Sequence, residues 1–301
     1  MFLPRLVPAL LCFGLLAQTP PVFRIRALRP VEQLRREAAA QKPPVEKGDF
    51  LAFDLIDLAT LDSSIRLDIR YATTNNFLST PVYTQARALL QRPAAEALVR
   101  AHRALAKQGY GLLIHDGYRP WAVTWIFWQA TPADKHDFVA DPAQGSRHNR
   151  GCAVDLTLYD LKTGQPADMP SLYDEMSERA YPNYQGGSQA QRDLRELLRS
   201  AMEAQGFQVF PFEWWHFDYI DWARYPIGNL AFESMPMWGG SPEPRGASRP
   251  HNQSERALES PRGPGGPPHY APFKRPVRAS HRRNIRAKSP ALGDESSSSS
   301  V

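Results

Sequence analysis

Two stretches of the chain place apolar residues at helical spacing. One runs from about Pro93 to Gln108 and is followed by Gly109, and the other covers residues 190–207, with Gly206 near its end. Apolar positions that recur every three to four residues predict amphipathic helices, and a glycine just past the last such position predicts the helix end. A third, shorter helix is expected after Pro120, because proline suits the first turn of a helix.

Shorter runs, in which apolar residues alternate with polar ones or follow each other directly, predict β-strands. These runs lie at residues 50–61, 64–72, 111–120, 152–160 and 207–220. Helices and strands are mixed without regular alternation, which favours an α+β fold over a doubly wound parallel sheet. We expect one domain at residues 50–234, preceded by a charged, Ala- and Gln-rich linker or short helix at residues 23–49.

The basic charge is concentrated in the last part of the chain. The formal net charge is +5, but residues 235–301 hold 11 Lys and Arg against 5 Asp and Glu, whereas residues 1–234 hold 25 against 26. Residues 235–301 also contain 11 of the 28 prolines and a terminal serine run, so we predict a disordered tail. The basic run at 275–288 is compatible with phosphate binding. A solvated tail is the simpler interpretation, and we expect no specific nucleic-acid partner.

The first residues have the pattern of a secretory signal peptide. Arg5 precedes a mostly apolar run from Leu6 to Ala17, and a polar, proline-containing stretch follows. The run is too short to span a bilayer in the mature chain, which takes about 20 residues. We predict a signal peptide at residues 1–22 and a periplasmic or secreted protein without a stable membrane span; a cytoplasmic protein is the alternative. After cleavage, Cys152 would be the only cysteine, which excludes an intrachain disulfide.

Ionisable residues interrupt three of the predicted strands or the loops beside them. Burying such a group among apolar residues costs free energy unless the group is paired or bound to a metal. The residues concerned are Asp116 and Arg119, His148 and Asp155, and Glu213 and His216. The pattern therefore indicates an ion-binding site.

Two histidines and one carboxylate among these residues form a set suited to zinc. His148 lies in a loop that Gly151 turns into a strand, and Asp155 lies on the face of that strand opposite its apolar residues. With His216 they could hold one Zn²⁺ and leave a fourth position open for catalysis. On spacing alone, purely structural roles are equally compatible: a loop histidine, a salt-bridge partner and a core histidine.

Glu213 and Arg119 are candidates for the chemistry at such a site. Glu213 precedes His216 by three residues, so a turn or bulge is needed to bring both side chains to one face of a strand. There Glu213 could take a proton from the attacking water and pass it to the leaving amine. Arg119 could stabilise an oxyanion, or could form only a structural salt bridge with Asp116. The two tryptophans between Glu213 and His216 could exclude water from the site or pack in the core.

Several motifs resemble those of one enzyme family. Residues 146–155, SRHNRGCAVD, resemble the S-x-H-x-x-G-x-A-x-D motif of the D-alanyl-D-alanine metallopeptidases, and EWWHF at 213–217 resembles their second zinc motif. The similarity covers roughly residues 52–226. Three further segments resemble the dipeptidase branch of this family, which includes the vancomycin-resistance dipeptidase. They are HDGYRP (115–120), RYATTNNF (70–77) and DLTLYD (155–160).

The resemblance implies a small α+β domain whose antiparallel sheet carries one Zn²⁺ per chain. His148, Asp155 and His216 are then the zinc ligands, Glu213 is the general base and acid, and Arg119 stabilises the tetrahedral intermediate. The substrate pocket is expected to include Ser146, Tyr71, Asp116, Asp168 and Trp215.

The activity implied by the resemblance is hydrolysis of D-alanyl-D-alanine to two D-alanines, with a small peptide as the partner. A D,D-carboxypeptidase or endopeptidase on longer peptidoglycan peptides would share the same metal centre and is the alternative among enzymes. A non-catalytic zinc or cell-wall-binding module is the alternative of another class, although Glu213 and Arg119 argue against it. A vancomycin-resistance dipeptidase acts in the cytoplasm, whereas export of this chain would direct it to wall peptides in the periplasm.

Overall fold

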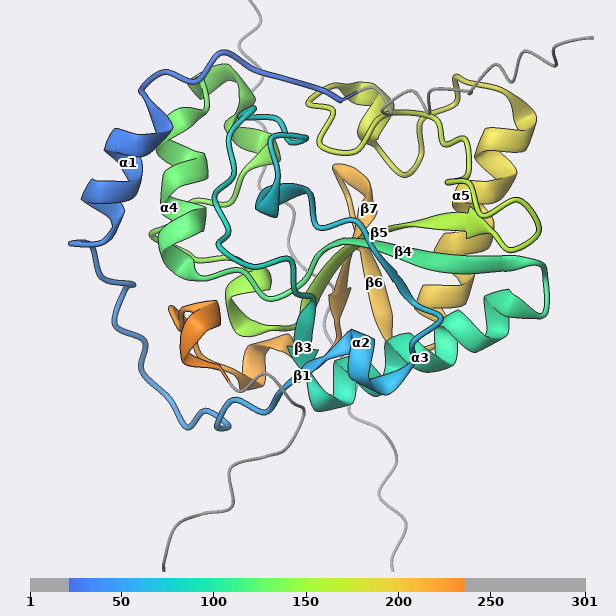
Figure 1. The fold of residues 1–301 in the computed structure, drawn as a ribbon, viewed down its shortest axis with the longest axis horizontal. Helices are drawn as coiled ribbons and strands as arrows, with labels where there is room; N and C mark the ends of the chain where they lie inside the picture. Colours follow the sequence, from blue (N-terminus) through green and yellow to red (C-terminus); the bar gives the residue numbers. More distant parts are fainter. Residues whose placement is uncertain (1–21, 236–301) are drawn as a thin grey trace, which may run out of the picture. The chain divides into compact units, whose positions relative to one another are not determined.

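The computed structural model describes residues 22–235, whose centre is a five-stranded sheet (Figure 1). The strands are β1 (Leu55–Asp57), β2 (Arg66–Leu67), β3 (Leu89–Gln91), β4 (Tyr110–Asp116), β5 (Ala153–Asp160), β6 (Phe207–Phe210) and β7 (Glu213–Tyr219). The large sheet has the order β2-β4-β5-β7-β6, in which only β2 and β4 are parallel, and β1 and β3 form a small antiparallel sheet. Almost all of the predicted signal peptide and basic tail lies outside the described residues.

Helices cover the sheet and flank it. Within residues 22–235 the α-helices are α1 (Val31–Ala38), α2 (Leu58–Leu61), α3 (Arg92–Ala106), α4 (Trp121–Ala130) and α5 (Gln189–Glu203). Helix α3 packs beside β4, and α5 packs against α3 and strands β5 to β7 (Figure 1). The three predicted helices are α3, α4 and α5, and the predicted α+β fold is confirmed. None of the helices in this part of the chain is both long and apolar enough to cross a membrane.

The segment expected as a linker or short helix, residues 23–49, contains α1 and packs against the rest of the fold. Val31, Leu34 and Ala38 recur at helical spacing and are buried, and α1 contacts α4 (Figure 1). This apolar stripe of α1 has a partner in α4, whose residues are apolar around most of its circumference. The compact unit therefore begins before residue 50.

The first two predicted strands are much shorter than their apolar runs. The run at 50–61 gives only β1, because the Asp57 side chain accepts a hydrogen bond from the backbone N–H of Ala59 (3.2 Å) and caps α2. The run at 64–72 gives only the two residues of β2 and then a 3₁₀ turn at Arg70–Ala72. That turn carries Tyr71 toward the centre of the molecule.

Strand β5 lies in the middle of the sheet and is buried on both faces. Val154, Leu156 and Leu158 belong to the main hydrophobic core, while Asp155 and Thr157 on the other face are also buried. A carboxylate in such a position needs a partner, because its desolvation is costly. Asp155 therefore marks the place where the fold encloses polar chemistry.

Candidate metal centre

A tight loop at residues 146–151 places His148 over the sheet. The Ser146 hydroxyl oxygen accepts a hydrogen bond from the backbone N–H of His148 (3.2 Å), and His148 starts one turn of 3₁₀-helix. Gly151 follows with φ of +67°, and a Cβ there would lie 2.5 Å from Leu55 Cδ2. Glycine adopts this left-handed conformation at low cost and leaves the space free. The loop can therefore enter β5 directly after His148.

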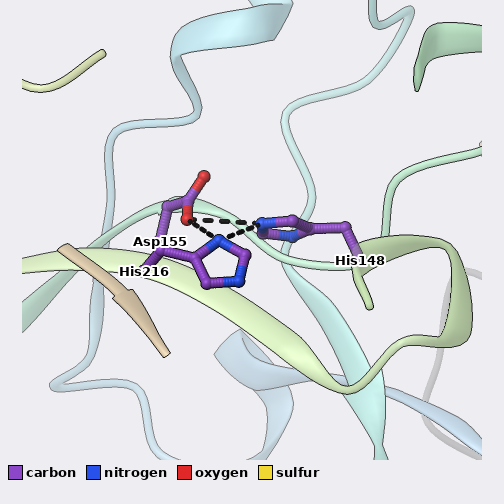
Figure 2. A group of neighbouring side chains, drawn as sticks. All are labelled: His148, Asp155 and His216. Carbon is purple, nitrogen blue, oxygen red and sulfur yellow. Dashed lines mark hydrogen bonds and ion pairs between the residues drawn. The ribbon is translucent and has the colours of Figure 1, made fainter. Parts of the chain in front are cut away.

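Three potential metal ligands meet at one point on the sheet. Asp155 and His216 are direct partners across the antiparallel strands β5 and β7, so their side chains leave the same face. His216 Nδ1 lies 3.1 Å from both Asp155 Oδ1 and His148 Nε2, and these last two atoms are 3.3 Å apart (Figure 2). The predicted grouping of His148, Asp155 and His216 is confirmed as a cluster able to hold a metal ion.

The outer nitrogen of each imidazole has an acceptor of its own. His148 Nδ1 lies 2.7 Å from the carbonyl oxygen of Gly117, and His216 Nε2 lies 2.9 Å from Asp218 Oδ1. A carbonyl or carboxylate oxygen only accepts, so these outer nitrogens carry the protons. In neutral imidazoles the inner nitrogens would therefore turn lone pairs toward each other and toward Asp155.

This convergence of acceptors requires positive charge. Asp155 Oδ1 is buried and has no hydrogen-bond donor, and the atoms nearest to it are two imidazole nitrogens. A proton on His216 is one source of charge: burial lowers its pKa, but Asp218 and Asp155 outweigh burial and raise it to about 10. A divalent cation satisfies all three groups at once, and two imidazoles with one carboxylate suit Zn²⁺ with a position left open. The residues thus fit the metal that the sequence pattern predicts.

Tyr173 fixes the second oxygen of the Asp155 carboxylate. Its hydroxyl donates to Asp155 Oδ2 at 2.9 Å, and its ring packs against His115 and Trp215, with centroids 4.5 and 5.6 Å away. Trp215 is buried behind Tyr173 and does not line the cavity over the metal cluster. The structure therefore does not bring Trp215 into the expected substrate pocket. Tyr173, which no sequence pattern indicated, contacts both Trp215 and Asp155.

The bulge needed to bring Glu213 beside His216 is present. Val209 of β6 pairs with Phe217, but the next residue, Phe210, pairs with Glu213, so the register shifts within the β6–β7 pair. Glu213 Oε2 consequently lies 3.7 Å from His216 Nδ1. Burial raises the pKa of Glu213 to about 8. A carboxyl group next to the cluster and titrating near neutral pH is suited to proton transfer.

Arg119 faces the cluster from the loop after β4. Its Nε and NH2 groups lie 2.9 and 2.8 Å from Asp116 Oδ2, and NH2 lies 3.6 Å from Asp155 Oδ2. The guanidinium also lies over the rings of Phe127 and Tyr71, 4.9 and 5.3 Å from their centroids. These contacts hold the cation at one orientation while it still lines the cavity.

Asp116 forms a salt bridge that holds the Arg119 side chain in place. Its Oδ1 accepts hydrogen bonds from the Tyr83 hydroxyl (2.7 Å) and the Gly117 backbone N–H (2.9 Å), and its Oδ2 is taken by Arg119. The carboxylate is completely buried and does not line the cavity. The expected contact of Asp116 with substrate is therefore replaced by the salt bridge that the sequence left open as the alternative.

A cavity of about 290 Å³ opens over the metal cluster. Its lining includes the predicted site residues Tyr71, Arg119, Ser146 and Glu213 together with the three metal-ligand candidates. The rest of its lining includes Phe77, Phe127, Phe138, Met176, Phe210 and Asp174. A largely apolar wall with a few convergent polar groups is typical of a site for a small molecule.

The acidic residue that reaches this cavity from the loop after β5 is Asp174 and not Asp168. Asp168 is exposed, accepts a hydrogen bond from Gln191 (3.0 Å) and lines a different hollow. Asp174 accepts a hydrogen bond from the Tyr71 hydroxyl (2.9 Å), while its Oδ2 is buried without a donor. Burial raises the pKa of Asp174 well above its usual value. Its φ of +60° is uncommon outside glycine, and no local sequence signal marked it.

Several known proteins are similar to this chain. A family model described as D-ala-D-ala dipeptidase matches residues 52–234. The D-alanyl-D-alanine dipeptidase of Escherichia coli (strain K12) is 36% identical over 174 residues, which cover 58% of this chain and 89% of the relative. The proteins of that name from Enterococcus faecalis and Enterococcus faecium are each 39% identical, covering 52% and 56% of this chain and 87% and 92% of their own length.

A solved structure of the LdcB LD-carboxypeptidase overlaps with a TM-score of 0.29 and 19% identity, over 44% of this chain and 59% of that one. That overlap is too weak to bear on the fold. The family model, by contrast, matches more than half of the chain, and the dipeptidases are matched over most of their length. The chain therefore belongs to the D-Ala-D-Ala dipeptidase family and is a metallopeptidase.

Proposed function

We propose that this metallopeptidase hydrolyses D-alanyl-D-alanine to two D-alanines, with Zn²⁺ held by His148, Asp155 and His216. The observation that carries the proposal is the convergence of two imidazole nitrogens and a buried carboxylate oxygen without a hydrogen-bond donor, beside a small cavity. The names of the relatives supply the substrate. Zn²⁺ bound there polarises a carbonyl and lowers the pKa of water, which makes a nucleophile available near neutral pH.

Glu213 is the proposed general base and acid. Its carboxylate lines the cavity and lies 3.7 Å from the inner nitrogen of His216. A neighbouring cation favours the ionised carboxylate over the protonated one, so Glu213 can accept the proton of the attacking water. The same proton then passes to the nitrogen of the leaving D-alanine, which departs as a neutral amine.

Arg119 is proposed to stabilise the negative charge that develops on the carbonyl oxygen of the scissile bond. A guanidinium held in advance by Asp116 loses little conformational freedom when it donates to that oxygen. The aromatic rings beneath Arg119 keep water away from the charge, which strengthens the interaction.

Asp174 is proposed to receive the free ammonium group of the dipeptide. Its buried Oδ2 has no donor, and Tyr71 holds the other oxygen in place. A substrate ammonium would supply the missing donor and keep the carboxylate ionised, whereas an acylated amine carries no charge. Ser146, also in the lining, is proposed to contact the peptide through its hydroxyl proton. A buried partner for a free amine favours a dipeptidase over an enzyme for longer peptides.

Release of D-alanine by the purified protein tests this proposal. The substrates are D-Ala-D-Ala, its N-acetylated form and a wall pentapeptide, each with chelator and after zinc add-back. Zinc-restored cleavage of the free dipeptide, much faster than of the other two, is expected. Faster cleavage of the blocked or longer peptides would instead assign a D,D-carboxypeptidase or endopeptidase. Stoichiometric zinc without turnover of any of them would assign a binding module.

Export of the protein is proposed from the apolar run at Leu6 to Ala17, which would place the activity on short wall peptides outside the cytoplasm. A fusion of residues 1–30 to a reporter that is active only outside the cytoplasm should be active, and an inactive fusion would assign the protein to the cytoplasm. A folded domain that includes α1 and ends at residue 234, followed by a separate tail at 235–301, is proposed as well. A chain shortened to residue 235 should keep its kcat and KM.

A further inference from the structure

We infer that Asp218 is a positioning residue of the metal centre, which selects the His216 tautomer that turns Nδ1 toward the metal, and that Arg147 holds Asp218 in place. The inference rests on the proposed zinc site but is independent of the proposed substrate.

Asp218 lies on β7 two residues after His216, so both side chains leave the same face of the strand. Its Oδ1 lies 2.9 Å from His216 Nε2, and its side chain is only 13% exposed. This hydrogen bond reaches the side of the imidazole that faces away from Asp155 and His148. Asp218 thus contacts a metal-ligand candidate from behind without itself belonging to the ligand cluster.

The position of the imidazole proton decides whether His216 can bind a metal. A neutral imidazole has one N–H and one lone pair, and only the nitrogen with the lone pair can be a ligand. A carboxylate accepts and never donates when ionised, so it keeps the proton on Nε2 and frees Nδ1. Its negative charge also makes Nδ1 a more basic ligand.

The two histidines differ in what holds them. His148 Nδ1 is bound by a backbone carbonyl, that of Gly117, which no substitution of a side chain removes. The acceptor for His216 Nε2 is instead a side chain, that of Asp218. Substituting Asp218 therefore tests the orientation of one ligand while the other remains held.

Arg147 restricts the Asp218 carboxylate from its other side. Arg147 Nε lies 3.6 Å from Asp218 Oδ2, and the guanidinium lies 4.8 Å from the centroid of the Trp222 ring. A purely structural salt bridge between Arg147 and Asp218 is the competing interpretation. The distances favour the positioning role, because the His216 contact at 2.9 Å is shorter than the Arg147 contact by 0.7 Å.

Zinc affinity, measured by competition with a chromophoric chelator, is the first test. Asp218→Ala should bind Zn²⁺ about 10- to 100-fold more weakly than the unchanged protein, the usual effect of removing such an outer partner. Asp218→Asn should lose less, because its amide oxygen still accepts from Nε2. The control is Asp221→Asn, which removes an acid 45% exposed and 3.5 Å from Arg224, and it should keep the affinity unchanged.

The second test is a double-mutant cycle with Arg147→Met. If Arg147 acts through Asp218, its substitution should weaken zinc binding in the unchanged protein but have little further effect in the Asp218→Ala background. Independent, additive losses would overturn the role given to Arg147. The positioning role of Asp218 would be overturned if Asp218→Ala bound zinc as tightly as the unchanged protein. It would also be overturned if Asp218→Ala and Asp218→Asn lost zinc affinity equally and in proportion to a fall in melting temperature. A wild-type protein that binds no zinc would overturn the metal site itself.

Discussion

Replacing Asp116 by asparagine should destabilise the protein markedly, although the two side chains have nearly the same shape. Asparagine still offers an oxygen to the Tyr83 hydroxyl and the Gly117 N–H, which now bind Asp116 Oδ1. It offers no charge to Arg119, however, and its amide hydrogens would face the guanidinium donors. The variant therefore isolates the loss of the buried countercharge.

The magnitude follows from the burial of the pair. The side chains of Asp116 and Arg119 are 0% and 9% exposed, so solvent screens their interaction little. Breaking a buried ion pair by removing one partner costs about 3–5 kcal/mol. Asp155 Oδ2, 3.6 Å from the guanidinium, can replace part of the lost charge, so we expect the lower end, about 3 kcal/mol. For a domain of this size that corresponds to a fall in Tm of about 6–12 °C.

Urea unfolding followed by tryptophan fluorescence measures this change, with chelator present so that metal binding does not add to the stability. The matched control is Glu203→Gln, which breaks the surface pair of Arg199 and Glu203 at 2.8 Å and should cost less than about 1 kcal/mol. The double variant Asp116→Asn, Arg119→Met should regain part of the loss, because no unpaired cation remains. An Asp116→Asn protein as stable as the control would refute the assignment of Asp116 as the buried support of Arg119.

Three further predictions test the site and its surroundings. Glu213→Gln should lower kcat by about 10²- to 10⁴-fold with zinc content unchanged, as steady-state kinetics and metal analysis would measure; an unaltered kcat contradicts the assigned base. Asp174→Asn should raise KM for D-Ala-D-Ala by about 10- to 100-fold, since a hydrogen bond to a charged group contributes about 1.5–3 kcal/mol. It should also reduce the ratio of kcat/KM for D-Ala-D-Ala to kcat/KM for the N-acetylated dipeptide. An unchanged ratio would show that Asp174 does not bind the amine. Burial lowers the pKa of His115 from 6.5 to about 4, so the unfolded chain takes up a proton first and stability falls as the pH drops from about 6.5 to about 4. Urea unfolding across this range should show that His115→Gln removes about 3 kcal/mol of the loss, and an identical pH profile in the variant would refute this.

Sequence periodicity predicted the long helices better than the short strands. Helices α3 and α5 agree with their patterns, because an amphipathic stripe repeated over four turns specifies both the helix and the face that it buries. The apolar run at 50–61 contains a strand of only three residues, because one Asp57 side chain caps a helix inside it. Helix α1 was expected at most as a short helix in a linker, and only its contact with α4 shows that it belongs to the compact fold.

The site residues also fall into those that the sequence indicated and those that only the structure identified. His148, Asp155 and His216 could be grouped from the sequence because they lie in motifs that resemble those of a metallopeptidase family. The need for a bulge at Glu213 followed from the two-residue period of a strand. The resemblance placed Asp168 in the pocket, and nothing local distinguishes it from Asp174 in the same irregular loop. Burial and the hydroxyl of Tyr71, about a hundred residues away in the chain, distinguish them in the structure.

The sequence by itself determined the main helices, which depend on apolar residues at short, regular separations. Its motifs also pointed to the family and to the candidate metal ligands. Tertiary structure decided which oxygen and nitrogen atoms of the candidate ligands meet, which acid of the loop after β5 lines the cavity and which acid holds Arg119. Those choices depend on partners far apart in the chain, such as Asp116 with Tyr83 and Asp155 with Tyr173. Desolvation makes each such pairing decisive, because a buried charge without its partner is costly, and burial exists only once the chain has folded.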